Sequence, residues 1–421
     1  MSTPPPLKND CFALPPGVHW TPVDEALAHL RNGLVPVAGV EQRALGDALG
    51  RVLAAPALAA RANPPYANAA VDGYGFAHAS LPTGDGPCRL PLATGRAAAG
   101  GPFPGSVPPG MALRILTGAM LPDGVDSILL QEDVTLDDGH IVFHPGLKRG
   151  ANTRKAGEDV AAGAVALSAG QRLRPQDIAL GAALGISEVQ VFRPLRVAVL
   201  STGDELVEAG QVPAAHQMFD ANRPMLHSLL TLWGAEVIDL GRAADTGHDV
   251  RQRLSRGVAE ADAILTTGGA SAGDEDHVSA VLKREGVLNT WRIAVKPGRP
   301  LALANWGGTP IFGLPGNPVA AFVCALIFAR PALSVLAGGG WIDPLAVTVP
   351  AAFAKSKKPG RREYLRARLD AEGRAEVFAS EGSGRISGLS WAEGLVELPD
   401  AALDVAPGTP VRYLPFAGFG L

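Results

Sequence analysis

The chain has 421 residues, of which 47% are hydrophobic and 19% charged, with a formal net charge of -4. That length exceeds one ordinary domain of roughly 100 to 200 residues, so we expect a folded chain of two to four domains. The weak negative charge excludes the basic surface with which proteins hold nucleic acid. Three cysteines without a CxxC pair indicate a reducing compartment, which predicts a cytoplasmic protein.

The first half of the chain predicts a helical domain interrupted by a β-rich one. Residues 1–17 are proline-rich and lack the apolar segment of a signal peptide, so we expect a loose tail. Apolar residues have helical spacing from Thr21 to Leu58. Short strand-like segments between glycine and proline turns fill residues 63–150, which predicts an inserted β-rich domain. Helical spacing then returns over 151–190, and we expect this segment to pack against residues 18–62 as one elongated helical domain.

The second half predicts an α/β domain followed by a small β domain. Residues 191–335 alternate strand, glycine turn and helix, which favours a doubly wound, mostly parallel sheet covered by helices on both faces. Residues 341–421 contain shorter strand-like pieces typical of a small antiparallel, barrel-like domain. The longest apolar run, from Val319 to Ala329, ends at Arg330 and Pro331 and is shorter than the ~20 residues that span a membrane. We therefore expect no membrane partner.

Two glycine-containing stretches follow predicted parallel strands. They are "STGDEL" (201–206) and "TTGGASAGDED" (266–276). Ligands of open parallel sheets bind at the carboxyl ends of the strands, and the glycines of the second stretch would let its backbone approach an oxyanion. The stretch matches neither the dinucleotide nor the Walker fingerprint. Its carboxylates, Asp274 to Asp276, would equally serve as an ordinary cap of the next helix, so the residues alone leave two interpretations open.

Two Pro-Gly turns come next. "AVKPGRPLAL" (294–303) places Lys296 and Arg299 around one turn, and two cations on a stiff turn suit an oxyanion. "FGLPGNPVAAF" (312–322) precedes an apolar helix and forms a second candidate anion-binding helix start. We expect both turns to follow strands of the same sheet. The alternative for each is a tight surface connection.

Polar residues also gather in three stretches of the first half. "VDGYG" contains Asp72, "ILTGAM" contains Thr117 and "NTRKAGEDV" contains Asp159. Taken singly, each stretch is typical of a turn or of a solvated charged surface. No histidine or cysteine spacing matches a structural zinc site, and the absence of GxSxG argues against triad hydrolysis.

Taken in order, these stretches resemble the molybdopterin molybdenumtransferase family, which includes bacterial MoeA and the homologous domain of gephyrin. "VDGYG", "TGAMLPDGVDSILLQED", "NTRKAGEDV", "STGDEL", "GGASAGDED", "KPGRP" and "LPGNPVA" follow one another as the family motifs do, over nearly the whole chain. The resemblance implies four domains and an elongated homodimer whose site lies at the subunit interface. It also implies insertion of molybdate into adenylylated molybdopterin, with release of AMP.

The resemblance assigns functional residues in both halves of the chain. Those in the first half would face the sheet domain across the dimer interface, and the catalytic set is Asp72, Thr117, Asp159, Glu205, Asp245, Asp276 and Lys296. Residues that would hold the pterin substrate or molybdate are Gly268, Gly269, Ser271, Gly273, Arg292, Arg299, Pro315, Gly316, Asn317, Arg366 and Ser383. The resemblance is also compatible with contacts to a molybdopterin adenylyltransferase and to downstream molybdoenzyme chaperones.

The mixture of charges indicates a metal ion. Carboxylates beside a pterin phosphate joined to AMP would repel it unless a divalent cation lay between them. Magnesium accepts a few carboxylate and phosphate oxygens, so we expect Mg²⁺ at Asp276 and Asp274. Lys296 and Arg299 would then hold molybdate, a dianion.

The sequence departs from the family pattern at three positions. Arg292 stands where the family commonly has a second lysine, Ala69 where a serine is frequent, and Val71 where methionine is usual. A planar guanidinium is not equivalent to a compact ammonium, so the preference between molybdate and tungstate is open. Two other functions also stay open at this point. One is adenylylation of molybdopterin by ATP, and the other is a dimeric pterin-binding scaffold without turnover.

Overall fold

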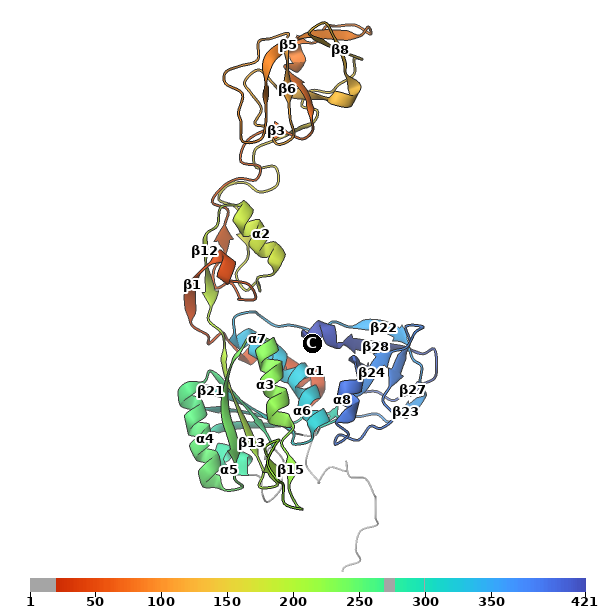
Figure 1. The fold of residues 1–421 in the computed structure, drawn as a ribbon. Coiled ribbons are helices and arrows are strands. Elements are labelled where there is room, and N and C mark those ends of the chain that lie inside the picture. The colour runs from red at the N-terminus through yellow and green to blue at the C-terminus, as the bar shows by residue number, and fades with distance from the viewer. Residues whose placement is uncertain (1–19, 269–276, 299) are drawn as a thin grey trace, which may run out of the picture. The chain divides into compact units, whose positions relative to one another are not determined.

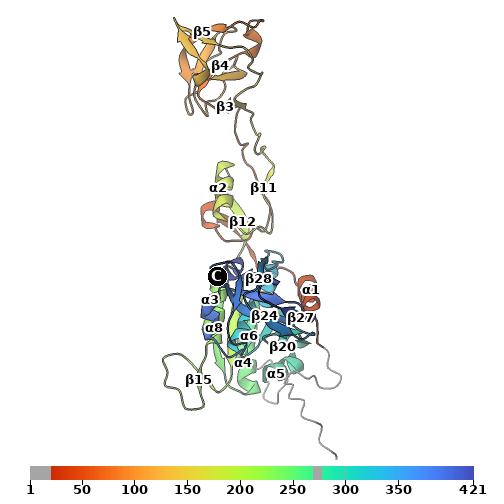
Figure 2. The same cartoon turned by 90° about the vertical axis from the view of Figure 1, so that its right-hand side faces the viewer.

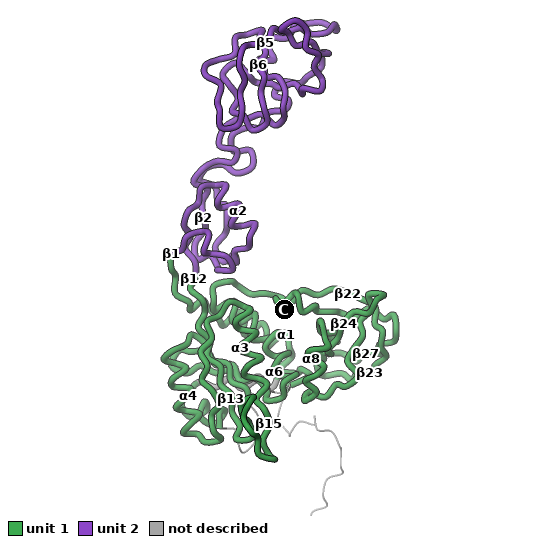
Figure 3. Tube along the Cα trace, in the orientation of Figure 1, with its two compact units in different colours: residues 1–41, 192–421 green, residues 42–191 purple. Residues whose placement is uncertain are grey.

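The computed structural model describes residues 20–268, 277–298 and 300–421. The chain forms two compact units, one made of residues 1–41 and 192–421 and the other of residues 42–191 (Figure 3). Each unit has its own hydrophobic clusters and is described separately.

A six-stranded sheet organises the first unit (Figure 1). Its first four strands run parallel, as the alternation of strands and helices in the sequence predicts, and each of its last two strands pairs antiparallel with the strand before it. In spatial order the strands are β16 (Glu236–Ala243), β13 (Arg196–Thr202), β17 (Ala263–Thr267), β21 (Thr309–Leu314), β20 (Pro300–Trp306) and β18 (Val287–Arg292).

Helices cover both faces of this sheet because successive side chains of a strand point to opposite faces. Val197 and Val199 of β13 belong to a cluster with α1 (Val23–Gly33), α3 (Asn222–Leu232) and α6 (Pro318–Cys324). Ala198 and Leu200 belong to a second cluster with α4 (Gly247–Glu260) and α5 (His277–Glu285). The prediction of a doubly wound, mostly parallel sheet is confirmed.

Among the described residues, one helical stretch is long and apolar enough to cross a membrane by length and composition. It comprises α6, a π-helical segment (Ala325–Ala329) and α7 (Arg330–Leu336), 19 residues in all, and 89% of its most apolar window is buried inside the fold. The expectation that this segment is too short was wrong, because the helix continues beyond the apolar run. The π segment changes the hydrogen-bond ladder just before Pro331, which has no N–H to donate.

A small β domain ends the first unit, as predicted. Its sheet has the order β19 (Val295–Lys296), β24 (Arg362–Leu369), β26 (Gly394–Leu398), β28 (Pro410–Pro415) and β22 (Val347–Pro350), with β25 (Ala375–Val377) beside β24. A separate pair joins β23 (Lys355–Lys357) to β27 (Leu403–Val405), and α8 (Ser387–Trp391) follows β25. Strand β19, which precedes the α/β domain's strand β20 in the chain, is therefore part of the C-terminal sheet.

A loop between β13 and α3 carries the short parallel pair β14 (Leu206–Val207) and β15 (Met218–Phe219). Figure 2 shows this loop leaving the body of the α/β domain. Val212, within the loop, is 95% exposed.

The second unit confirms the predicted β-rich domain. Its six-stranded sheet has the order β7 (Ser127–Leu130), β4 (Gly73–Phe76), β6 (Ala112–Ile115), β5 (Cys88–Ala97), β9 (His140–Phe143) and β8 (Thr135–Asp137). Three two-stranded pairs connect it to the rest of the chain: β3 (Asn68–Ala69) with β10 (Thr153–Arg154), β2 (Ala57–Leu58) with β11 (Val165–Leu167), and β1 (Val40–Ala44) with β12 (Glu188–Phe192).

The connecting segments are less helical than the sequence predicts. Between Thr21 and Leu58 the only α-helix is α1, and over residues 151–190 the only one is α2 (Pro175–Ala183). Helix α1 packs in the core of the first unit, so it does not join α2 in one helical domain. Glycines at positive φ, such as Gly157 and Gly163, interrupt the second segment, and its short strands β10, β11 and β12 pair with distant partners.

Candidate active site

The carboxyl ends of the four parallel strands coincide. Thr202 lies opposite Ala243, Ser201 opposite Thr267, and Thr267 opposite Leu314. The loops that follow these strands therefore share one edge of the sheet. They contain the predicted site residues Glu205, Asp245, Gly268, Pro315, Gly316 and Asn317.

At two positions of this edge, neighbouring atoms lie so close to the backbone that only glycine fits. Gly268 has φ +82°, and a Cβ on it would lie 2.7 Å from the carbonyl oxygen of Thr202. Gly203 has φ +135°, and a Cβ on it would overlap the carboxylate of Glu205. Glu205 therefore folds back over its own turn. A Cβ on Gly316 would meet the Cα of Gly268 at 3.6 Å, which places the two glycine turns in contact.

Asn222 joins these turns, and the sequence analysis did not identify it. Asn222 is the first residue of α3. Its side-chain amide donates to Thr267 Oγ1 at 2.7 Å and to the carbonyl of Gly316 at 2.6 Å. Thr267 Oγ1 in turn donates to the carbonyl of Pro315 at 3.2 Å. Among the described residues, several buried polar oxygens here have no hydrogen-bond partner, and such atoms are normally satisfied by ligand or water. They belong to Ser201, Thr202, Asn222 and Thr266.

Carboxylates lie beside the glycine turns. The backbone N–H of Asp204 donates to Asp245 Oδ2 at 3.0 Å, and that of Asp245 donates to Asp204 Oδ1 at 3.4 Å. Arg242 donates to Asp204 at 3.1 Å. These bonds fix the turns that carry Glu205 and Asp245, so the edge presents carboxylate oxygens next to a polar, glycine-lined surface.

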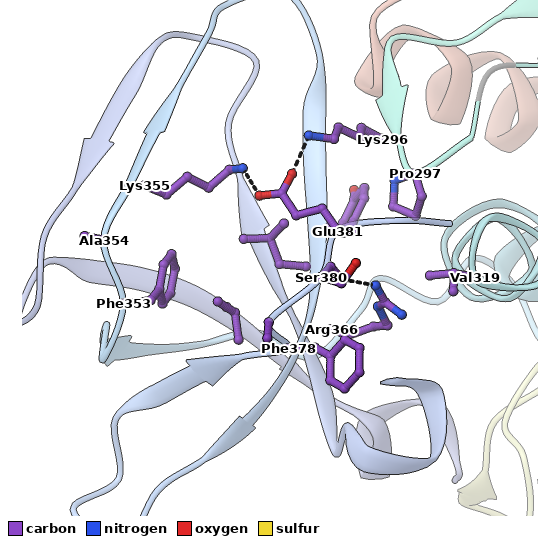
Figure 4. A pocket seen from close by; sticks show the side chains of 14 residues that line it. Lys296, Pro297, Val319, Phe353, Ala354, Lys355, Arg366, Phe378, Ser380 and Glu381 are labelled. Carbon is purple, nitrogen blue, oxygen red and sulfur yellow. Dashed lines mark hydrogen bonds and ion pairs between the residues drawn. The ribbon is translucent and has the colours of Figure 1, made fainter. Parts of the chain in front are cut away.

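A cavity of about 200 Å³ lies between the first Pro-Gly turn, which contains Lys296 and Pro297, and the C-terminal β domain (Figure 4). Lys296, Lys355, Arg366 and Glu381 line it. Lys296 Nζ lies 2.6 Å from Glu381 Oε2 and 3.5 Å from Glu363 Oε1. Lys355, Glu363 and Glu381 could not be predicted from the sequence, because no local motif connects them with Lys296.

The charges of this cavity stabilise one another. Burial raises the pKa of Glu381, but hydrogen bonds from Lys296 and Lys355 outweigh it, so the pKa lies below its ordinary value. Burial lowers the pKa of Lys355, but the contacts with Glu381 and Glu363 outweigh that effect and raise it. Both groups are therefore charged near neutral pH.

The Lys296 turn connects β18 to β20 of the α/β sheet, as expected, but within it Val295 and Lys296 form the short strand β19 of the C-terminal sheet. Lys296 ends β19, which pairs with β24 and places Lys296 opposite Glu363. The peptide bond from Lys296 to Pro297 is cis. A Cβ on Gly298 would lie 3.6 Å from a side-chain atom of Pro315, so the two Pro-Gly turns still meet.

Arg366 holds the segment that carries Ser383. The Arg366 side chain is buried, and its guanidinium donates to the backbone carbonyls of Ser380, Gly382 and Arg385 while lying 4.9 Å from the ring centre of Phe378. Burial lowers the pKa of Arg366. The carbonyl of Ser383 accepts a hydrogen bond from the backbone N–H of Val319 at 3.2 Å, which docks the segment on the start of α6.

In the second unit, Asp72 and Thr117 lie together. Asp72 Oδ1 accepts hydrogen bonds from the hydroxyl of Thr117 at 2.6 Å and from its backbone N–H at 2.7 Å, and these two bonds lower the pKa of Asp72. Asp159 accepts a bond from Asn63 at 2.8 Å and is exposed. Ala69, the departure from the family pattern, is buried and its carbonyl accepts from the N–H of Gly118 at 2.8 Å.

Several predicted residues lie outside the described part of the chain. They are Gly269, Ser271, Gly273, Asp274, Asp276 and Arg299, together with the side chain of Arg292. Among the residues that the structure does describe, no three histidine, cysteine or acidic side chains form a cluster that could hold a metal.

The fold and the polar sheet edge define a class of α/β protein whose ligands bind at the carboxyl ends of parallel strands. Residues 198–335 match the family described as "Probable molybdopterin binding domain". Residues 21–185 match "MoeA N-terminal region (domain I and II)", and residues 348–416 match "MoeA C-terminal region (domain IV)". The chain therefore belongs to the MoeA family.

Known relatives and structures agree with this assignment. The chain is 35% identical to the molybdopterin molybdenumtransferase of Haemophilus influenzae, over 94% of this chain and 98% of that protein. It is 33% identical to molybdopterin molybdenumtransferase 2 of Mycobacterium tuberculosis, over 87% and 93% of the two chains. The crystal structure of a molybdopterin biosynthesis MoeA protein from Pyrococcus horikoshii superposes with a TM-score of 0.81 at 27% identity, covering 94% of this chain and all of that one.

Proposed function

We propose that this protein inserts molybdate into adenylylated molybdopterin and releases AMP. The curated relatives that carry the name molybdopterin molybdenumtransferase span nearly the whole chain, which supports this reaction. One observation of the fold carries the proposal further. The turn that bears Lys296 packs through Gly298 against Pro315 of the sheet-edge turn, so a cation-lined cavity adjoins a pterin-type binding edge.

The two parts of this site suit the two substrates. The sheet edge offers the turns of Gly268 and Gly316, held together by Asn222, where backbone can approach a phosphate group. The cavity offers the ammonium groups of Lys296 and Lys355 to the oxygens of molybdate. Catalysis would then depend mainly on positioning the two anionic substrates and on neutralising their charge.

Magnesium is part of the proposal. Asp276 and Asp274 would hold it, and Glu205 and Asp245 supply further carboxylate oxygens, the ligands that Mg²⁺ prefers, at the same sheet edge. Bound there, the ion would offset the negative charge of the phosphoanhydride and polarise it for cleavage. Arg292 and Arg299 would add cations on the molybdate side.

We further propose a cytoplasmic homodimer in which Asp72, Thr117 and Asp159 of one subunit complete the site of the other. Two hydrogen bonds from Thr117 hold the half-buried carboxylate of Asp72 in one orientation, and this fixed position supports a functional role. Contacts with an adenylyltransferase and with molybdoenzyme chaperones would supply the substrate and receive the product. We likewise propose residues 1–17, 63–150, 191–335 and 341–421 as segments of the domain organisation, whereas 18–62 does not join 151–190 as a whole, because α1 packs in the core of the first unit.

The decisive experiment supplies purified protein with adenylylated molybdopterin, molybdate and Mg²⁺ and follows AMP release and formation of active cofactor. AMP release that depends on molybdate supports the transferase. Consumption of ATP with free molybdopterin would instead indicate adenylylation, and retained pterin binding without turnover would indicate a scaffold. The matches to the MoeA N-terminal and C-terminal regions disfavour these two alternatives.

Two test substitutions and one control substitution sharpen this experiment. Lys296→Met should reduce AMP release at least tenfold, while Lys283→Met, which removes an exposed lysine of α5, should leave it unchanged. Asp276→Ala should abolish release at low Mg²⁺ without unfolding the protein. Unchanged turnover in Asp276→Ala would exclude the proposed metal ligand.

A further inference from the structure

Four charged side chains form a closed ring, and three of them, Lys296, Lys355 and Glu381, line the cavity of Figure 4. Glu381 contacts Lys296 through Oε2 at 2.6 Å and Lys355 through Oε1. Glu363 contacts Lys296 through Oε1 at 3.5 Å and Lys355 through Oε2 at 3.2 Å. Each carboxylate thus bridges both ammonium groups, and the ring of two cations and two anions has no net charge.

The two carboxylates are held very differently. Glu363 lies within β24, opposite Lys296 on one side and Leu398 on the other, and its side chain is 9% exposed. Glu381 lies between β25 and α8, outside any strand, and its side chain is 43% exposed. A rotation about the side-chain bonds of Glu381 would carry its carboxylate into solvent, whereas Glu363 has no such route.

The ring is incompatible with a bound oxyanion in its present form. Glu381 occupies the positions next to Lys296 Nζ and Lys355 Nζ that the oxygens of molybdate would need. The contact of Lys355 with Glu363 Oε2 does not have hydrogen-bond geometry, and that oxygen accepts no hydrogen bond from the described residues. The Lys355 ammonium group is therefore directed toward Glu381, and an oxyanion that took the place of the Glu381 carboxylate would accept the same hydrogen bond.

We propose that Glu381 is a displaceable internal counterion, which neutralises Lys296 and Lys355 in the empty site and must swing out before an oxyanion binds. This inference rests on the proposed function, because it takes molybdate as the anion that enters the cavity. A tethered competitor reduces the apparent affinity by the fraction of molecules in which the site is free. Glu381 thus sets the anion concentration at which the site fills, and Lys355 is the second cation of the molybdate site.

The test is molybdate binding to the full-length protein without pterin, measured by isothermal titration calorimetry. Glu381→Gln keeps the shape of the side chain but removes its charge, and should tighten molybdate binding on the order of tenfold. Lys355→Met should weaken it at least as much. Glu372→Gln is the matched control, because it removes an exposed carboxylate that pairs with Arg374 in a turn of the same β domain. Thermal melting of each variant verifies that it is folded.

The outcomes separate this inference from the proposed reaction. Equal or weaker molybdate binding by folded Glu381→Gln overturns the counterion role, as does absence of molybdate binding in every variant. If the counterion role is overturned in this way but the wild-type protein still releases AMP and Lys296→Met does not, the proposed reaction is supported and only the role of Glu381 is refuted. Tighter binding by Glu381→Gln together with no AMP release in the wild type would support the counterion and refute the reaction.

Discussion

The replacement of Asn222 by alanine should destabilise the first unit by about 3 kcal/mol. The Asn222 amide makes two hydrogen bonds, to Thr267 Oγ1 at 2.7 Å and to the carbonyl of Gly316 at 2.6 Å, and the side chain is buried. Each buried hydrogen bond contributes roughly 1 kcal/mol net, and a carbonyl left without a donor costs about 1 kcal/mol or more. Thr267 Oγ1 and the Gly316 carbonyl both lose Asn222 as a donor, but Thr267 Oγ1 still donates to the carbonyl of Pro315, so the larger penalty falls on the Gly316 carbonyl.

Urea denaturation followed by tryptophan fluorescence measures this loss in the correct unit. All six tryptophans of the sequence lie in residues 1–41 and 192–421, so the signal reports the first unit alone. Asn305→Ala is the matched control, because Asn305 is exposed and only accepts a bond from the N–H of Gly308 at 3.0 Å. We expect the control to cost less than about 1 kcal/mol. An ordinary surface substitution changes the free energy of unfolding by at most about 0.5 kcal/mol. If Asn222→Ala differs from the wild type by no more than this, the reasoning is refuted.

Three further predictions follow from the described geometry. Asp72→Asn should lower AMP release at least tenfold while leaving the tryptophan-detected unfolding of the first unit unchanged; normal turnover would remove Asp72 from the site. Burial raises the pKa of Asp262, but hydrogen bonds led by Arg193 outweigh it, so the folded pKa lies below the ordinary 3.8. The stability from this ion pair is then fully present above pH 3.8 and is lost as the pH falls through the folded pKa. Asp262→Asn should cost about 2 kcal/mol at pH 7 and flatten the acid dependence of urea midpoints, and an unchanged acid profile would contradict this. Gly203→Ala should cost about 2 kcal/mol and reduce turnover, since φ is +135° and the new Cβ would displace Glu205; wild-type stability and activity would exclude the close approach.

The sequence predicted the α/β sheet and the convergence of its loops for a simple physical reason. Strand and helix periods are local, and parallel strands necessarily bring their carboxyl ends to one edge. Glu205, Asp245, Gly268 and Asn317 could therefore be placed together from their positions after successive strands. The helical prediction for the connecting segments was wrong for the opposite reason. Strand β1 pairs with β12, far along the chain, and long-range pairing leaves no local period.

The sequence by itself determined the family and the part of the site at the sheet edge. Both depend on short motifs, each of which contains its functional residues within a few positions. Only the tertiary structure decided how the cationic half is built. Lys296 and Glu381 are separated by 85 positions, and they meet because β19 leaves the α/β sheet and pairs with β24 of the C-terminal one. No local pattern determines which sheet a strand joins, since this depends on which distant surfaces are buried together.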